Sequence, residues 1–599
     1  MNKLLTYYQK ELSFLKHNGK LFSKKFPKIA RRLGMTEGSS EDPHVSRLIE
    51  SFALLTSRIH QRLDYDMPEV IEALISKLAP QFLRTLPSVS IVMVKLDPKE
   101  SGLTCKSELK QGVPIFTKQD TGHVCQFQTV YPINLLPLNI NNVELFYNSS
   151  ELNWQLKLHF QVWHNAYLDG ECLRLYLNGS ASTVNVIYTL LFSQIKALFL
   201  YLDGIKIELP IDAVIPVGFK PEDALISKAP SISPVHILLL DYFWFQQKFW
   251  FVDIQLPTDL KIISGCKFEI SILFNTTPFT EQLEHLFTEI NKDFFRLNCT
   301  PAINLFPLRA DPIILTDSSS EYPITPMSHN QSQIDVWSIQ KVSVQRKTSH
   351  NVEYLPILPL SERFSHTLVD NNSRLYWQAL YHEICHHHGV EYKKFIAFSK
   401  HAEYQEPEKP DVISIDLLCS NNHLPNQLKY GITEGDFDSD IPLAGVKILT
   451  LTHPTQPALP PEKSEIYWRF LSLLSLNYQL LCDEDGVERL KDIFTLYNFN
   501  QKTGGRSLYK LIKLLNSEPI TARLDRTNPH SVARGINVTV TFCKDAQLEP
   551  EYYLFCCMLD NMLALYSPVN SFIRLTTCIE YDDRSHKVWP IRAGKLSWL

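Results

Sequence analysis

The chain of 599 residues is too long for a single hydrophobic core, so its length predicts roughly two to four domains. With 44% hydrophobic and 21% charged residues, its composition is that of an ordinary globular protein. The 59 basic and 64 acidic residues nearly balance and form no long run of either sign, which argues against a nucleic-acid surface and against a binder of anionic membranes. We expect no nucleic-acid partner and no direct membrane insertion.

The cysteines and the apolar segments indicate a cytosolic protein. The 12 cysteines contain no CxxC pair, so we interpret them as reduced thiols. The N-terminus has no apolar run long enough for a signal peptide. The most apolar helical stretch, 466–481, carries Arg469 and Asn477 and is too short to span a bilayer.

An apolar stripe at nearly heptad spacing opens the chain and predicts a helix within residues 1–35. Its members are Leu4, Tyr8, Leu12, Leu15, Phe22 and Phe26. A polar, turn-rich linker follows at 34–43.

Residues 42–88 predict two further helices. Asp42 can accept a hydrogen bond from the first free N–H groups of a helix, and Pro43 suits its first position. The first stripe consists of Val45, Leu48, Ile49, Phe52, Leu55, Ile59 and Leu63. After Pro68, the second consists of Val70, Ile71, Leu74, Ile75 and Leu78.

Three consecutive amphipathic helices make a poor isolated domain of this size. We therefore predict that residues 1–88 form an N-terminal helical bundle segment whose apolar seam is shared with another chain. The alternative is that these helices simply cover the next domain.

From residue 89 the pattern changes to period two and to short apolar runs, which predicts a β-sandwich-like domain over 89–299. Asp203-Gly204 is a hairpin signal. Short helices are predicted to begin at 190–195 and to lie at 280–291.

The rest of the chain is predicted to form two further domains, so the whole chain is predicted to have an α+β multidomain fold. Residues 300–455 predict a Pro-rich connector, to about 333, and a second β-rich domain. Residues 456–599 predict a mixed α/β C-terminal domain. Its expected helices lie at 464–482, 487–497 and 550–566, and its expected strands at 538–542 and 572–581.

Residues 382–389, HEICHHHG, satisfy the HExxH pattern of zinc proteases. In that motif two His at i and i+4 of a helix bind one ion, and the Glu polarises a water. This allows an alternative function, a zinc-dependent hydrolase using His382, Glu383 and His386. The flanking sequences favour two strands joined through a His-Gly turn, and Tyr392 stands where a third His would be needed. We therefore expect no catalytic residue, no resident metal and no cofactor.

Several ordered stretches resemble the TssF (VasA/ImpG) family of type VI secretion baseplate subunits. They are YYQKELSFLK, FPKIARRLG, DPHVSRLIESFALLTSRI, RLDYDMPEVIEALISKLAPQFLRTLPS, EYPITP, VWSIQKV, YWQA, YWRFLSLLSLNYQLL, ARGI, LYSPVNSFIRL and VWPIRAGKLSWL. They extend from about residue 7 to residue 596, and the chain departs most from the family in its middle.

The resemblance implies a non-enzymatic scaffold, similar to the wedge proteins of contractile phage baseplates. Two copies would join one TssG-like subunit, with TssE-like and TssK-like subunits and the VgrG spike hub as further partners. The location would be cytoplasmic, in a baseplate docked at the inner-membrane complex of a Gram-negative bacterium. Interface candidates are Leu4, Tyr8, Leu12, Leu15, Val45, Leu48, Ile49, Phe52, Ile59, Leu63, Val70, Leu74 and Leu78.

Overall fold

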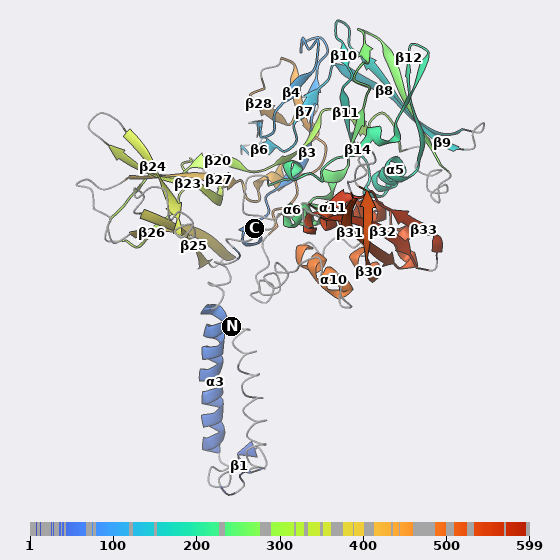
Figure 1. Ribbon diagram of the computed structural model, residues 1–599. Coiled ribbons are helices and arrows are strands. Elements are labelled where there is room, and N and C mark those ends of the chain that lie inside the picture. The colour runs from blue at the N-terminus through green and yellow to red at the C-terminus, as the bar shows by residue number, and fades with distance from the viewer. Residues whose placement is uncertain are drawn as a thin grey trace. The chain divides into compact units, whose positions relative to one another are not determined.

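The computed structural model of the chain is mixed and strand-rich, with several separate sheets, in agreement with the predicted α+β class (Figure 1). It describes residues 8, 12, 26, 28, 35–36, 39–40, 43–66, 75, 80–118, 124–148, 153–226, 234–275, 289–316, 319–328, 333–347, 352–360, 375–386, 389–400, 412–432, 435–441, 444–458, 486–498, 508–523, 532–567, 571–580 and 582–594. The chain divides into two units. Met1–Leu83 with Pro461–Ser475 form the first, and Arg84–Pro460 with Leu476–Leu599 form the second.

A 24-residue helix, α3 (Pro43–Asp66), dominates the described part of the first unit (Figure 1). Pro43 is its first residue, as predicted, because a missing N–H costs nothing there. The predicted linker before it contains a small antiparallel hairpin of β1 (Met35–Thr36) and β2 (Ser39–Ser40). A 3-10 helix, η1 (Pro80–Leu83), ends the segment.

The other helices expected in residues 1–88 lie mostly outside the described residues. Tyr8, Leu12, Lys28 and Ile75 are helical. The N-terminal helical bundle therefore stays a prediction. No helix among the described residues is both long enough and apolar enough to cross a membrane.

Six strands of the second unit form a closed barrel. Its order is β19-β3-β29-β28-β5-β6. The strands are β3 (Val89–Leu96), β5 (Pro114–Thr117), β6 (Gln126–Thr129), β19 (Cys299–Ile303), β28 (Phe437–Ser439) and β29 (Val446–Thr450). It takes strands from both 89–299 and 300–455, and the four-part domain division stays a prediction.

The structure differs from the expected connector at 300–333, because residues from both halves of this stretch are core residues. Every residue of β19 is buried. Phe306, Ala310, Ile313 and Ile324 belong to the core of the next sheet. Prolines interrupt this stretch, but the apolar residues between them lie in the core of the barrel and in the core of the eight-stranded sheet.

An antiparallel five-stranded sheet of order β13-β12-β17-β9-β8 confirms the strand-rich character of the middle region. Its strands are β8 (Leu138–Asn148), β9 (Asn153–Val162), β12 (Ile195–Leu202), β13 (Ile205–Leu209) and β17 (Lys267–Phe274). Asp203 and Gly204 both have positive φ, 48° and 84°, which matches a two-residue type I′ turn. The predicted hairpin is confirmed.

Smaller sheets adjoin these. One has the order β14-β15-β11-β18, with β11 (Cys172–Leu177), β14 (Val214–Pro216), β15 (Phe251–Gln255) and β18 (Phe295–Arg296). Two-stranded pairs join β4 (Ser107–Leu109) to β7 (Ile133–Leu135), and β10 (Leu168–Asp169) to β16 (Lys261–Ile262). Among the described residues of the second unit, 3-10 helices lie at Ile211–Ala213, Pro221–Asp223, Gln246–Phe249, Leu424–Gln427, Leu508–Leu511 and Lys544–Leu548.

Two helices in the middle region depart from the sequence prediction. The helix expected to begin at 190–195 ends there instead, as α5 (Ala181–Ser193), and α6 (Pro234–Trp244) was not predicted. Both bury residues on all sides, so neither carries an amphipathic period.

A sheet of eight strands follows, with the path β20-β27-β23-β24-β25-β26-β22 and with β21 paired to β27. The strands are β20 (Phe306–Arg309), β21 (Ile313–Ile314), β22 (Glu321–Pro323), β23 (Asp335–Lys347), β24 (Val352–Pro359), β25 (Leu375–His386), β26 (Gly389–Lys400) and β27 (Val412–Ser420). Only β24 and β25, among these described pairs, run parallel.

The C-terminal part contains a strand–helix–strand crossover. Strand β31 (Val532–Phe542) leads into α11 (Tyr552–Tyr566), and β32 (Phe572–Ile579) returns parallel to β31. Strands β30 (Ile512–Arg523), β33 (Asp582–Val588) and β34 (Arg592–Ala593) complete the sheet, and α10 (Gly486–Tyr497) precedes it. The predictions for 487–497, 538–542, 550–566 and 572–581 are confirmed, whereas 464–482 lies outside the described residues.

This C-terminal part packs on the helices of the middle region. The Tyr553 hydroxyl on α11 donates to the Phe192 carbonyl of α5 at 2.8 Å. Nδ1 of His236 on α6 contacts the Tyr497 hydroxyl of α10. A single core therefore joins α5, α6, α10 and α11.

Candidate assembly surface

Helix α3 presents large apolar side chains to solvent. Leu48, Phe52 and Leu55 are 68%, 60% and 58% exposed. They follow one another at steps of four and three, so they lie on one face of the helix. We call these three residues the α3 strip. Surface apolar residues are usually scattered singly, so a helical row of three indicates a binding surface.

The opposite face of α3 is small and buried. Ala53 and Ser57 are both 0% exposed, and they lie four residues apart. The Ser57 hydroxyl donates to the Leu54 carbonyl at 2.8 Å, so burial leaves it satisfied. Among the described side chains, α3 therefore buries these two small residues and exposes Leu48, Phe52 and Leu55.

The structure places the predicted interface residues unequally. Leu48 and Phe52 are exposed, whereas Tyr8 and Leu12 are helical and half-buried. Four others belong to α3 but have side chains outside the described part: Val45, Ile49, Ile59 and Leu63. The rest lie outside the described residues altogether: Leu4, Leu15, Val70, Leu74 and Leu78.

Sequence reasoning missed Leu54, which is 46% exposed. It lies off the stripe, about 120° around the helix from Leu48, so periodicity gave no signal for it. A second apolar position on another face of α3 is therefore also open to solvent.

The HExxH segment is a strand, which contradicts the helix that a zinc-hydrolase site needs. It lies in β25, paired antiparallel with β26, with His382 opposite Lys393 and His386 opposite Gly389. Residues four apart on a strand are separated by roughly 13 Å, too far to share one ion. The predicted hairpin is confirmed, and the hydrolase alternative is wrong in its geometry.

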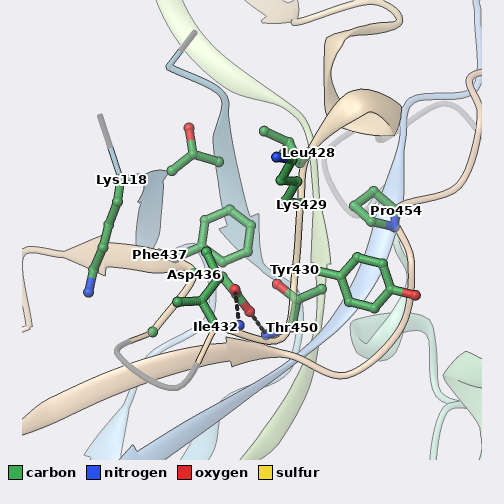
Figure 2. Close-up of a pocket in the computed structure, with 11 residues that line it drawn as sticks. Lys118, Leu428, Lys429, Tyr430, Ile432, Asp436, Phe437, Thr450 and Pro454 are labelled. Carbon is green, nitrogen blue, oxygen red and sulfur yellow. Dashed lines mark hydrogen bonds between the residues drawn. The ribbon is translucent and has the colours of Figure 1, made fainter. Parts of the chain in front are cut away.

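A small pocket of about 60 Å³ lies beside β28 and β29 (Figure 2). Asp436, on its wall, accepts backbone hydrogen bonds from Gly431, Ile432 and Thr450 at 3.1, 3.0 and 2.7 Å. Sites for small molecules usually measure about 300–1,000 Å³, whereas this one holds about two waters. The carboxylate therefore fixes a loop on the barrel and does not form a substrate site.

The buried ion pair of Lys248 and Asp241 also has a structural role. Their side chains are 2% and 1% exposed. Burial raises the pKa of Asp241, and the charge of Lys248 opposes that rise. Asp241 also accepts a hydrogen bond from the Leu225 N–H at 3.2 Å. The pair thus joins three segments around α6.

The buried thiols are poor nucleophiles. Burial raises the pKa of Cys125, Cys172 and Cys419 to about 12, so these thiols stay protonated at neutral pH. Within the described part of the chain, no group of three or more His, Cys, Asp or Glu side chains is arranged to hold a metal ion. The α3 strip is therefore the strongest candidate for function.

Comparison with known proteins points to an assembly. Relatives include TssF1 of Pseudomonas aeruginosa, described as a type VI secretion system component, which is 27% identical over 628 aligned residues and 99% of each chain. A cryo-electron microscopy structure of a TssK-TssF-TssG baseplate subcomplex contains a chain 25% identical to this one. Its TM-score is 0.70, and the match covers 92% of this chain and 99% of the other.

A second structure, of a type VI secretion baseplate complex, shares the fold at 22% identity. The TM-score is 0.56, with 99% of both chains covered. The family model described as "Type VI secretion system, TssF" matches residues 1–596. Since that match takes in nearly the whole length, the chain belongs to the TssF family of type VI secretion system baseplate components.

Proposed function

We propose that this chain is a structural, non-enzymatic wedge subunit of a type VI secretion baseplate and that the α3 strip binds a TssG-like subunit. The observation that carries the proposal is the exposure of Leu48, Phe52 and Leu55 on one helix face. The similar chain in the TssK-TssF-TssG subcomplex supports the choice of partner.

The energetics suit an apolar seam. Burying a Leu or Phe side chain contributes ~1.5–3 kcal/mol, so three such residues supply several kcal/mol toward binding. We extend the candidate seam to the remaining predicted residues: Leu4, Tyr8, Leu12, Leu15, Val45, Ile49, Ile59, Leu63, Val70, Leu74 and Leu78.

The proposed assembly contains two copies of this chain and one TssG-like subunit. TssE-like and TssK-like subunits and the VgrG spike hub are its further partners, and the complex is cytoplasmic, docked at the inner-membrane complex. Family membership and the similar chain in the TssK-TssF-TssG subcomplex support a baseplate role with TssG-like and TssK-like partners. The copy number, the TssE-like subunit, the spike hub and the docking rest on the family resemblance alone. Native mass spectrometry of the co-purified complex tests the copy number, because one copy per TssG-like subunit would contradict the two-copy assembly.

The seam is tested by charging the strip. Leu48→Asp or Phe52→Asp should lower affinity for the TssG-like subunit by at least about 100-fold, because binding would bury a carboxylate in an apolar seam. Co-purification and a titration by interferometry measure the loss. Both residues are exposed in the free chain, so its unfolding free energy should change by no more than about 0.5 kcal/mol.

The matched control is Leu54→Asp, the same chemical change on the same helix but on another face. It should keep the complex intact. Equal loss in Leu48→Asp and Leu54→Asp would contradict a seam confined to the α3 strip. Unchanged binding in both Leu48→Asp and Phe52→Asp would refute the seam altogether.

A further inference from the structure

The chain crosses between the two units at residues 83/84, 460/461 and 475/476, and the segments of the second unit next to the first two crossings lie side by side. Leu86–Ile91 leads in, and Leu451–Ala458 leads out, close to the unit boundaries at residues 83/84 and 460/461. Leu86 and Ala458 exchange both backbone hydrogen bonds, at 2.9 and 3.1 Å. This pairing continues the ladder of β3 and β29, in which Thr450 lies opposite Val92. We call the paired segments the neck.

Threonine hydroxyls complete the neck where its backbone is irregular. The Ile91 N–H donates to the Thr452 hydroxyl at 2.9 Å, and the Val89 N–H donates to the Thr455 hydroxyl at 3.0 Å. Return bonds run from the Leu451 N–H to the Ile91 carbonyl at 2.8 Å and from the Thr455 N–H to the Val89 carbonyl at 2.9 Å. The neighbouring prolines, Pro454 and Pro457, restrict φ further.

The incoming segment is also tied to the eight-stranded sheet. Trp337 on β23 is 3% exposed, and its Nε1–H donates to the Thr85 carbonyl at 2.8 Å. The Arg84 guanidinium lies 4.7 Å from the centre of the same ring, within cation–π range. The Asn304 N–H, after β19, donates to the Ser88 carbonyl at 2.9 Å. The segment from Arg84 to Ser88 is therefore bound both by the eight-stranded sheet, through Trp337, and by the residue after β19 of the barrel, Asn304.

We propose that the neck is a rigid strut that fixes the point and direction at which the connections at residues 83/84 and 460/461 leave the second unit. A single-stranded linker could bend at any residue, whereas a hydrogen-bonded pair of strands resists bending along its length. Any bending at these two connections then occurs beyond Arg84 and Ala458. In the proposed baseplate, two copies in different surroundings would share one neck geometry.

Amide hydrogen exchange tests the rigidity directly. In the full-length protein, the amides of Leu86, Val89 and Ala458 should exchange within about tenfold of Val94 and Ile448, which pair inside the barrel. Exchange more than about 100-fold faster in the neck would overturn the proposal. Thr452→Val, which removes the hydroxyl acceptor at nearly constant shape, should speed exchange at Ile91 by about fivefold.

A cross-link tests whether the neck ever has to open. Paired residues on antiparallel strands have Cα atoms about 4.5–5.5 Å apart, which suits a disulfide. Leu86→Cys with Ala458→Cys should oxidise readily, with a mass loss of about 2 Da, and should bind the TssG-like subunit equally when oxidised and reduced. The matched control is Val94→Cys with Ile448→Cys in the same ladder.

The outcomes separate this proposal from the proposed function. Binding by the reduced form and not by the oxidised form would show that the neck opens, against the proposal. Failure of the neck pair to oxidise while the control pair oxidises would show that the two segments are not held together. Failure of every form, including wild type, to bind would instead refute the choice of partner, and the exchange experiment would still test the strut.

Discussion

Side-chain size separates the two faces of α3 at the residue scale. Ala53 and Ser57 pack within the chain, and Leu48, Phe52 and Leu55 do not. The hydroxyls of Ser51 and Thr56 each donate at 2.8 Å to the carbonyl four residues earlier. These bonds satisfy both hydroxyls within the helix itself. This pattern suits an element that packs inside its own chain and in a larger assembly at once.

The buried His236 should make the unfolding free energy depend on pH. Burial lowers the pKa of His236 from 6.5 to about 4. Between these values the unfolded chain binds a proton that the folded chain does not, so the unfolding free energy falls as pH decreases from 6.5 toward 4. Between pH 7 and pH 5 the expected loss from this residue is about 2 kcal/mol.

His236→Phe should remove that part of the pH dependence, whatever its effect on stability at neutral pH. Chemical unfolding of both proteins at pH 7 and pH 5 measures the difference. Tyr497→Phe serves as the control, since burial is the cause of the shift and the hydroxyl contact is not. An equal pH dependence in His236→Phe and wild type would contradict the assignment.

At the element scale, the β25–β26 hairpin places the HExxH segment on a strand, and this argues against a zinc-hydrolase site. With His386 opposite Gly389, the strands extend to the edge of the HExxH segment, and residues 387–388 alone lie between them. In the HExxH motif the two His bind one zinc because they lie one helical turn apart, whereas on a strand His382 and His386 are separated by roughly 13 Å.

We expect no stoichiometric zinc in the purified protein, measured by elemental analysis after dialysis. We also expect His382→Ala and His386→Ala to leave binding of the TssG-like subunit unchanged. One zinc per chain, lost in either variant, would reopen the hydrolase question.

The elements also mark how far the sequence can predict this fold. The Asp203-Gly204 hairpin and α3 follow from local turn chemistry and periodicity. Helices α5 and α6 were missed because their buried residues surround them and leave no stripe. The barrel could not be predicted either, because β3 pairs with residues 299–303 and 446–450, and no local pattern records such distant partners. For the α3 strip, the sequence predicted the apolar face, but its exposure and the exposed Leu54 required the structure.

At the scale of the whole molecule, the two units should differ in stability. The second unit has a barrel, two large sheets and a helical core, whereas α3 leaves four described large apolar side chains in water, Leu48, Phe52, Leu54 and Leu55. Local stability follows buried apolar contacts and protected hydrogen bonds. A partner that covers the α3 strip should therefore stabilise the first unit selectively.

Hydrogen exchange with and without the TssG-like subunit checks this expectation. Amides of α3 should exchange at least about tenfold more slowly in the complex, and amides of β3 and β19 should be slow in both states. Leu48→Asp should abolish the difference at α3. Equal slowing in the barrel and in α3 would indicate a global effect of binding, against a local seam.

The barrel has a further consequence for synthesis of the chain in the cell. Strand β3 is made early, but its neighbour β29 follows roughly 350 residues later. At ~5–20 residues per second, the ribosome needs about 20–70 s to supply it. During that time one side of β3 is an unpaired strand edge, a site prone to aggregation. The nascent chain thus has a long interval in which chaperones, or early pairing of β3 with β19, must protect it from misassembly.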